Sequence, residues 1–430
     1  MGLQAKLQTL LRSSDFKRFF AIRLLCQSGD GMFQAALATL FFFSPASQGT
    51  PSAIAFALFV MLAPFTFVGP FVGVFLDRWQ RRNIIVVTDS IRLVLTLAII
   101  GVILTWGITP AVYVLALIAL SLNRFLLAAL GASLPRVVAS ENLLIANSIL
   151  PTIGAAATGV GAVVGVLLGL FMPAGDTRDA ATLGLASVVF AASIVVALGF
   201  DAHRLGPTRS EQERHDDVSA GRIVRDLFTA MRVLIQLKTP ARALATMAGM
   251  RLLYGMVFVS SILVARNYFS SGDGTGLGSF AQIIGLTAAG FALAIFVTPL
   301  VASRIGEAKW IVVCMLVAVV AQAIITVRLV PATMLVTAFL LGVATQGAKI
   351  ALDTIIQQDT PDEYRGRAFI LYDMLFNIAF MTAGGLCALL LPVTGVSHVM
   401  YAALGVGYFI LSLGYMRVKT RPAPLTVEQV

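Results

Sequence analysis

Ionisable and amide side chains interrupt several long apolar runs of this chain, and the first such run is the clearest place for chemistry. Arg23, Gln27, Asp30 and Gln34 follow one another at spacings that place them on one face of a helix. Asp30 lies near the middle of its run. A carboxylate withdrawn from water favours its neutral form unless it is paired, which suits a group that takes up and releases a proton. We therefore predict that Asp30 exchanges protons or binds a cation. The alternative is a fixed ion pair with Arg23 or with an arginine of another run.

A second polar face occurs far along the chain. Gln346, Lys349, Asp353 and Gln357 again share one side of a helix. Lys349 and Asp353 are four residues apart and can pair within the helix. They lie toward one end of their apolar run, where a lysine can extend to water. This pair is predicted to have a structural or gating role.

Familiar catalytic motifs do not occur in the sequence. It has no G-x4-G-K-[ST] phosphate-binding loop and no Ser/His/Asp or Cys/His set that could be placed in one pocket. The three histidines have no metal-ligand spacing, and the three cysteines lie inside apolar runs, where they serve as small hydrophobic residues. We predict that the protein is not an enzyme and uses no metal and no cofactor.

The apolar runs themselves define the fold class. Hydrophobic residues make up 58% of the 430 residues and charged residues only 12%, with a mean hydropathy of +0.90. A helix needs about 20 apolar residues to cross a bilayer core. With this length the chain contains about twelve spans. Barrel strands would be shorter and would alternate in polarity. The prediction is an all-α integral membrane protein, with spans near 19–43, 53–76, 83–107, 110–133, 143–172, 180–200, 241–265, 278–302, 309–329, 332–356, 368–392 and 396–416.

Basic residues are distributed unequally between the loops. If the N-terminus is cytoplasmic, most of the 31 Lys and Arg fall on the cytoplasmic side, and Arg178, Arg266 and Arg328 are the exceptions in the opposite loops. This is the positive-inside bias. It predicts a multi-pass protein of the cell membrane, in bacteria the inner membrane, with both termini in the cytoplasm. The net charge of +10 then contacts anionic lipid headgroups and not nucleic acid.

A polar stretch at 201–222 stands near the middle of the chain. After it, Ile223, Leu227, Met231 and Leu234 repeat at helical spacing, which predicts an amphipathic helix on the cytoplasmic membrane surface. The segments 135–146 and 361–368 share a Glu-x4-Ala spacing, and such parallel repeats are typical of transporters. The predicted domains are an N-terminal six-helix half at 1–200, a linker at 201–239, a C-terminal six-helix half at 240–417 and a cytoplasmic tail at 418–430.

Further ionisable residues inside the spans need a reason, because a charge at the bilayer centre costs about 2.5–3.5 kcal/mol on insertion scales. Asp89, Arg92 and Arg124 lie in the third and fourth spans, and Arg251 is followed by Tyr254 in the seventh. The predicted proton-coupling and substrate residues are Asp30, Arg23, Gln34, Arg124, Arg251, Lys349 and Asp353. In the fifth span, Gly161, Gly165 and Gly169 form a G-x3-G-x3-G face for close helix packing.

The loop between the second and third spans carries the most specific motif. Residues 69–82 read GPFVGVFLDRWQRR, an apolar run that ends in a dense group of charges. This stretch resembles the G-x3-D-R-x-G-R-R signature of the major facilitator superfamily, with Gln80 in the position of a glycine. Together with the span count, the central loop and the repeat, the resemblance extends over nearly the whole chain. It implies twelve transmembrane helices in two six-helix halves around a central substrate path.

The resemblance also implies a role for the loop as a latch between the halves during the inward–outward change. It assigns this role to Asp77, Arg78 and Arg82, with Asp373 as a partner across the halves. Gly69 and Gly73 would let another helix approach closely. The simpler interpretation is that the arginines of this loop only keep it on the cytoplasmic side, as the positive-inside bias requires. Such an anchor does not need Asp77.

The sequence therefore predicts a secondary active transporter. By resemblance to the multidrug and macrolide exporters of that family, it would export small amphipathic compounds in exchange for protons. Its partners would be a small-molecule substrate, protons and membrane lipid. The alternatives are a proton-coupled importer of a metabolite in the same fold and, more remotely, a non-transporting membrane receptor or scaffold.

Overall fold

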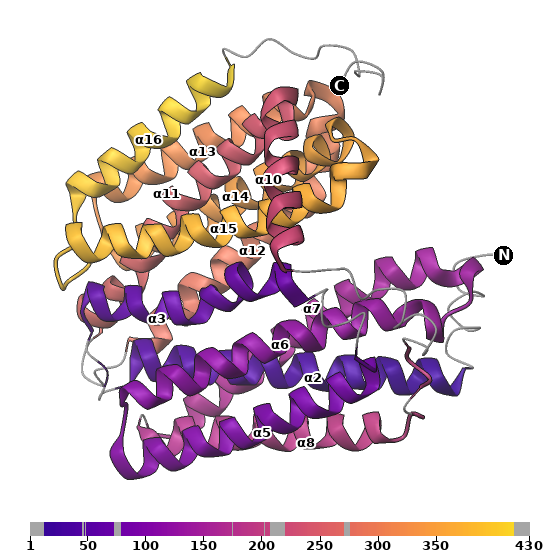
Figure 1. Ribbon diagram of the computed structural model, residues 1–430. Coiled ribbons are helices and arrows are strands. Elements are labelled where there is room, and N and C mark those ends of the chain that lie inside the picture. Colours follow the sequence, from indigo (N-terminus) through magenta and orange to yellow (C-terminus); the bar gives the residue numbers. More distant parts are fainter. Residues whose placement is uncertain are drawn as a thin grey trace. The chain divides into compact units, whose positions relative to one another are not determined.

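The computed structural model describes residues 13–44, 47, 49–72, 79–173, 175–201, 203–206, 220–270 and 276–416, and every regular element in these ranges is a helix (Figure 1). The α-helices are α2 (Ser14–Ala38), α3 (Pro51–Ala63), α5 (Arg81–Trp106), α6 (Pro110–Val137), α7 (Ser140–Phe171), α8 (Asp176–Leu198), α10 (Ala220–Leu237), α11 (Thr239–Asn267), α12 (Leu277–Ile305), α13 (Glu307–Val327), α14 (Pro331–Asp359), α15 (Asp362–Leu390) and α16 (His398–Met416). The π-helical turns η1 (Thr39–Phe43) and η2 (Pro64–Val68) and the 3₁₀ turn η3 (Gly69–Phe71) follow α2 and α3.

Eleven stretches in the described ranges are long and apolar enough to cross a membrane. They are α5, α6, α8, α11 to α16, the stretch Pro51–Phe71 and Ile149–Leu168 within α7. The helix α2 is of similar length but carries the polar face with Asp30. Each of the twelve predicted spans thus corresponds to a helix, and the all-α membrane fold class is confirmed. Several helices begin before the predicted span because a polar turn precedes the apolar run. In α2, for example, the Ser13 hydroxyl accepts a hydrogen bond from the Phe16 amide and caps the helix start at Ser14.

The chain forms two compact units, which we describe separately. Unit 1 comprises Met1–Gln48 and Val60–Ile223, and unit 2 comprises Gly49–Phe59 and Val224–Val430. The boundary near 223 falls inside the predicted linker, and the start of α3 groups with unit 2. There, the backbone of Ala55 lies beside Gly384 of α15.

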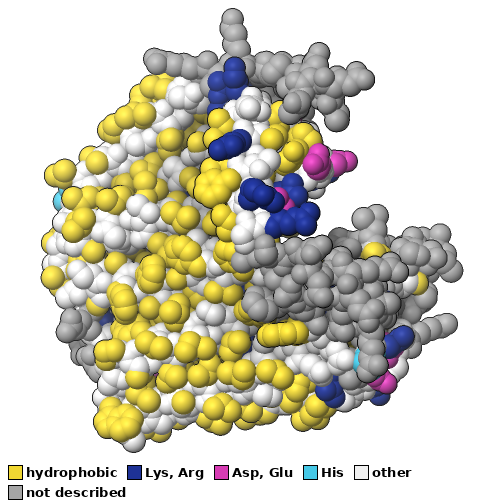
Figure 2. Space-filling model, in the orientation of Figure 1, with side chains coloured by type: hydrophobic (Ala, Val, Ile, Leu, Met, Phe, Trp, Pro, Cys, Tyr) yellow, Lys and Arg dark blue, Asp and Glu magenta, His cyan; other side chains and the backbone are white. Residues whose placement is uncertain are grey.

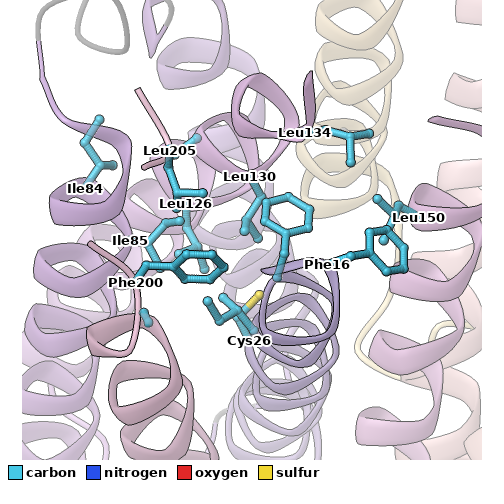
Figure 3. Packing of buried hydrophobic residues seen from close by; sticks show 14 of the residues in the cluster. Phe16, Cys26, Ile84, Ile85, Leu126, Leu130, Leu134, Leu150, Phe200 and Leu205 are labelled. Atoms are coloured by element: carbon cyan, nitrogen blue, oxygen red, sulfur yellow. The ribbon is translucent and has the colours of Figure 1, made fainter. Parts of the chain in front are cut away.

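In unit 1, α2 packs against α7 and α8, and α5 packs against α6 and α8. A cluster of buried apolar side chains lies between these helices (Figure 3). Phe16 and Cys26 of α2 contribute to this cluster, together with Ile85 of α5 and Leu126 and Leu130 of α6. Cys26 is fully buried there, as a small apolar side chain would be.

In unit 2, α11 packs against α14, α15 and α16, while α12 and α13 pack against α14. The crossing of α12 and α14 is very close. A Cβ atom placed on Gly290 would meet the backbone of α14, and one placed on Gly342 would meet the carbonyl oxygen of Thr287. Glycines allow this approach because they have no side chain.

The outward face of the helices is apolar. Large hydrophobic side chains such as Val94, Leu97, Val195, Phe296 and Leu389 are more than half exposed. Figure 2 shows hydrophobic side chains over much of the described surface. So much exposed apolar surface is that of a protein embedded in lipid.

The predicted amphipathic helix corresponds to α10, whose direction in Figure 1 differs strongly from that of α11 and α15. Leu227, Ala230 and Leu234 are buried on one side of α10. Phe228 and Ile235 are 61% and 60% exposed. Arg367 of α15 reaches Asp226 of α10 at 3.5 Å. One face of α10 is therefore buried, and the apolar strip with Phe228 and Ile235 is left uncovered.

Candidate functional site

A buried group of three charges joins α2 to α5 in unit 1. The carboxylate of Asp30 in α2 forms an ion pair with the guanidinium of Arg92 in α5. Nη1 of Arg92 also donates a hydrogen bond to Oδ1 of Asp89, one turn earlier in α5, at 3.0 Å. The side chains of Asp30, Asp89 and Arg92 are 4%, 0% and 1% exposed. Charges so well removed from water are stable only when they are paired, so this contact holds α2 and α5 together.

Asp89 and Arg92 face the interior of the helix bundle because α5 carries its polar side chains on its inward face. The inward face of this helix carries Thr88, Asp89, Arg92 and Thr96, all buried. Its outward face is apolar, and Ile91 is 41% exposed. This is the arrangement expected of a helix whose surroundings are lipid, because the polar side chains turn toward the bundle interior.

Aromatic rings close the other side of the charges. The Phe190 ring of α8 lies 4.2 Å from Cζ of Arg92, which is a cation–π distance. Phe33 of α2 packs beside it, with ring centroids 6.4 Å apart. Gly29 allows this arrangement, because a Cβ atom there would collide with the Phe190 ring. The guanidinium is thus held between two carboxylates and an aromatic face.

The crossing of α2 and α7 brings another pair of glycines into the site. A Cβ atom on Gly31 would collide with the carbonyl oxygen of Thr158, and one on Gly161 would collide with the carbonyl oxygen of Ser28. A Cβ atom on Gly165 would lie 3.0 Å from Cβ of Ala35. The predicted packing role is therefore confirmed for Gly161 and Gly165. The close crossing excludes water from the helix turn that carries Asp30.

The other polar residues of α2 have different neighbours. Nε of Arg23 donates a hydrogen bond to the carbonyl oxygen of Leu150 in α7 at 3.0 Å, so Arg92 and not Arg23 pairs with Asp30. Gln27 is buried and its amide lies against Gly154, whereas Gln34 is half-buried. The sequence indicated an arginine of another span as one partner of Asp30, and Arg92 is that arginine.

Arg124 of α6, another predicted site residue, lies against an aromatic ring, with its Cζ 3.2 Å from the centroid of the Phe65 ring. Sequence reasoning named Asp89 and Arg92 but left them out of the predicted site. The signal that could have included them is their i, i+3 spacing on the single polar face of α5.

Unit 2 contains a half-buried charge of a different kind. Arg251 of α11 is surrounded by aromatic rings from α11 and α15. Its Cζ lies 3.8 Å from the ring centroid of Phe376, 4.3 Å from that of Phe380 and 5.3 Å from that of Tyr254. Nε of Arg251 is buried and has no hydrogen-bond partner in the described part of the chain.

The pair predicted on α14 forms as expected. Nζ of Lys349 lies 2.6 Å from Oδ2 of Asp353, and both side chains are about one-third exposed, at 37% and 31%. The ammonium group also lies 5.4 Å from the ring centroid of Tyr372. An ion pair with this degree of exposure contributes little to stability.

Comparison with known proteins agrees with this architecture. The family model described as Major Facilitator Superfamily matches residues 19–383 and 253–429. The chain belongs to the major facilitator superfamily. It is 33% identical over 382 residues to uncharacterized MFS-type transporters of Mycobacterium tuberculosis and Mycobacterium bovis, with 89% of this chain and 86% of each relative covered. The protein is thus a multi-pass membrane protein and a transporter of the MFS type.

Solved structures of the superfamily share the fold. A nucleoside transporter superposes with a TM-score of 0.64 at 11% identity, covering 94% of this chain and 98% of that chain. A bacterial homologue of the iron transporter ferroportin in its inward-facing state has the same TM-score at 17% identity, with 97% and 99% covered. At this level of identity the likeness concerns the fold alone.

The superfamily signature loop is described in part. Gly73, Asp77 and Arg78 lie outside the described residues, so the latch remains a prediction. Arg82 donates a hydrogen bond to the adjacent Asn83 side chain at 3.0 Å. A Cβ atom on Gly69 would have no neighbour within 4 Å, so no close helix approach occurs there among the described residues. The backbone carbonyl of Asp373, the predicted latch partner, accepts a hydrogen bond from Asn377 at 2.8 Å.

Arg81, which was not among the predicted latch residues, anchors the start of α5. Its backbone amide donates to the carbonyl oxygen of Gly206 at 2.9 Å. Its Nη1 donates to the carbonyl oxygen of Ala132 in α6, also at 2.9 Å. The second arginine of the signature stretch therefore joins three segments of unit 1.

Proposed function

We propose that this protein is a proton-coupled secondary transporter that exports small amphipathic compounds by alternating access, with Asp30 as the coupling carboxylate. The observation that carries the proposal is the sharing of one buried guanidinium, Arg92, between carboxylates on two helices, Asp30 on α2 and Asp89 on α5. Buried ionisable groups inside a membrane are characteristic of proton and substrate pathways.

The shared guanidinium suggests how a proton would act. The group has one carboxylate more than guanidinium, and Oδ2 of Asp89 is buried without a hydrogen-bond partner in the described ranges. A proton on Asp30 would remove its charge and weaken the link between α2 and α5. Arg92 would remain hydrogen-bonded to Asp89, which lies in the same helix, α5. Loss of the proton would restore the link, so α2 could alternate between two positions relative to α5.

The surroundings of Asp30 are consistent with this exchange. From α5, Arg92 pairs with Asp30 and also bonds Asp89, and only 4% of the Asp30 side chain is exposed. Phe190 of α8 covers the opposite side of the guanidinium. After protonation of Asp30, the guanidinium of Arg92 would still lie beside it, and a neighbouring positive charge favours the charged form of a carboxylate, which promotes release of the proton.

The direction of transport rests on the resemblance to the multidrug and macrolide exporters of the superfamily. The latch role of Asp77, Arg78 and Arg82 rests on the signature loop in the same way. Proton-coupled import of a metabolite in the same fold is the alternative. Everted membrane vesicles with an imposed proton gradient distinguish the two, because they accumulate the substrate of an exporter.

The test is substrate-induced proton movement in proteoliposomes that enclose a pH-sensitive dye. The wild type is compared with Asp30→Asn and with Asp362→Asn, a matched control on an 88% exposed carboxylate. The substrates are a panel of lipophilic amines, carboxylates and neutral compounds. We expect proton flux with at least one compound in the wild type and the control, and none in Asp30→Asn.

Two results would count against the proposal. Unchanged flux in Asp30→Asn would leave Asp30 with a structural role in its pair with Arg92. If no compound moved protons in the wild type, while neutralising Asp30 left the protein stable, a receptor or scaffold would become the better interpretation.

A further inference from the structure

The start of α5 and the segment 203–206, which follows α8, lie side by side in unit 1. The backbone amide of Arg81 donates to the carbonyl oxygen of Gly206 at 2.9 Å, and Leu205 is fully buried in the apolar cluster of Figure 3. At the other end of this segment, His203 contacts the side chain of Gln80, the N-cap residue of α5. Gln80 stands where the superfamily signature has glycine, and a glycine has no side chain for such a contact.

A chain of three hydrogen bonds runs from Arg82 to His203. Nη1 of Arg82 donates to Oδ1 of Asn83 at 3.0 Å. Nδ2 of Asn83 donates to Oε1 of Gln80 at 2.9 Å, and Nε2 of Gln80 lies 3.2 Å from Nδ1 of His203. Each of the two amide groups therefore accepts through its oxygen and donates through its nitrogen.

The arginine fixes the direction of this chain. A guanidinium donates hydrogen bonds and cannot accept them, so Asn83 presents its oxygen to Arg82 and its nitrogen to Gln80. For the same reason Gln80 presents its oxygen to Asn83 and its nitrogen to His203. Nδ1 of His203 is then the acceptor, which requires a neutral imidazole ring with its proton on Nε2.

A second proton on the ring would remove this acceptor. Both nitrogens of a charged imidazole are donors, so N–H groups of Gln80 and His203 would face each other. Turning the Gln80 amide around would move the conflict to Asn83, and turning Asn83 around would move it to Arg82. Every arrangement of the two amides thus leaves one pair of donors in contact, because both ends of the chain would be cations.

Other contacts hold the segment in place independently of the charge on His203. Nη2 of Arg204 lies 2.6 Å from Oδ2 of Asp15 in α2, and Nη1 of Arg81 donates to the carbonyl oxygen of Leu205 at 3.4 Å. The charged residues that lie against this segment, from itself and from α2, α5 and α6, are Asp201, Arg204, Asp15, Arg81 and Arg136. Oδ1 of Asp201 is engaged by the backbone amide of His203 at 3.0 Å. A change of charge on the imidazole therefore acts first on the contact with Gln80.

We infer that Arg82, Asn83, Gln80 and His203 form a pH-sensitive clip, closed while His203 is neutral and opened when His203 takes up a proton. Histidine is the side chain that commonly changes its charge between about pH 5 and pH 8. Because the hydrogen bond from Gln80 requires the neutral ring, the closed clip is present at the higher pH and is lost as the pH falls. An open clip would release the side chain of Arg82, a predicted latch residue. That consequence rests on the proposed function, whereas the opening of the clip does not.

The test is hydrogen exchange of the Arg81 backbone amide, which follows Gln80 directly and donates to Gly206. The full-length protein in phosphatidylcholine nanodiscs is measured residue by residue with mass spectrometry at about pH 7.5 and about pH 5.5. The wild type is compared with His203→Asn, whose side-chain oxygen accepts at either pH, and with His203→Lys, which can only donate. The matched control is His398→Asn, at an exposed histidine of unit 2. All comparisons are made at equal pH, so the direct effect of pH on exchange cancels, and no transport is measured.

At about pH 7.5 we expect the wild type, His203→Asn and the control to exchange alike, and His203→Lys to exchange about twofold to tenfold faster. At about pH 5.5 the wild type and the control should exchange as fast as His203→Lys, while His203→Asn stays slow. Gln80→Gly, which restores the glycine of the signature, should exchange fast at both values and decides the matter if His203→Lys does not fold. Equal exchange in the wild type and the open variants at the higher pH would overturn the inference. So would a wild type that stays as protected as His203→Asn at the lower pH.

Discussion

The guanidinium of Arg92 in α5 forms an ion pair with Asp30 in α2, 62 residues earlier in the chain, while it also bonds Asp89 in its own helix. The two carboxylates are thus unequal in what they connect. The contact with Asp30 joins two helices, whereas the contact with Asp89 lies within one helix turn.

This inequality predicts different effects of the two aspartates on coupling. Asp89→Asn should retain substrate-induced proton flux in proteoliposomes, although at a lower rate, because the link between α2 and α5 still depends on Asp30. Asp30→Asn should lose the flux. Equal loss in both variants would show instead that the carboxylates act as one titrating unit.

Removal of the cation should harm stability more than removal of either carboxylate. Arg92→Gln leaves two buried carboxylates without their shared guanidinium, and breaking a buried ion pair in this way costs about 3–5 kcal/mol. Asp30→Asn leaves the Arg92–Asp89 pair intact and should be milder. The measurement is the thermal unfolding midpoint of the purified protein in detergent. A smaller shift for Arg92→Gln than for Asp30→Asn would contradict the geometry of the group.

The crossing of α2 and α7 predicts opposite results for two neighbouring glycines. Gly161→Ala would place a methyl group against the carbonyl oxygen of Ser28, and overpacking of this kind costs about 1–3 kcal/mol. Gly159→Ala is the control, because its Cβ atom would meet nothing within 4 Å and alanine favours a helix by about 1 kcal/mol. Thermal unfolding should separate the two variants, with Gly159→Ala at or above the wild type. Equal midpoints would mean that the helices can separate without cost.

The uncovered strip of α10 predicts contact with lipid. Spin labels at Phe228 and Ile235, which are 61% and 60% exposed, should be more accessible to oxygen than to a polar relaxation agent in bilayers. A label at Arg225, which is also exposed, should show the reverse because arginines of such a helix face the headgroups and water. The same water accessibility at all three positions would mean that α10 does not lie on the membrane.

The positions of the spans could be predicted closely from the sequence. The helices that form α5 and α11 begin and end within a few residues of the apolar runs at 83–107 and 241–265. The reason is physical: in hydrocarbon every backbone group must be satisfied within its own helix, and the bilayer thickness sets the length. The i, i+4 pair of Lys349 and Asp353 could be predicted from the sequence equally well, because the geometry of a helix determines which of its own residues meet.

The sequence by itself determined the helical membrane fold, the polar face of the first span and the deep position of Asp30, since composition and helical periodicity are local properties. Only the tertiary structure decided that Arg92 pairs with Asp30, that Arg23 instead bonds the carbonyl of Leu150, and that Arg251 lies among aromatic rings. These contacts depend on which helices are neighbours and on the glycines that let them approach, such as Gly31 and Gly255. Residues far apart in the chain acquire partners only when packing brings their helices together.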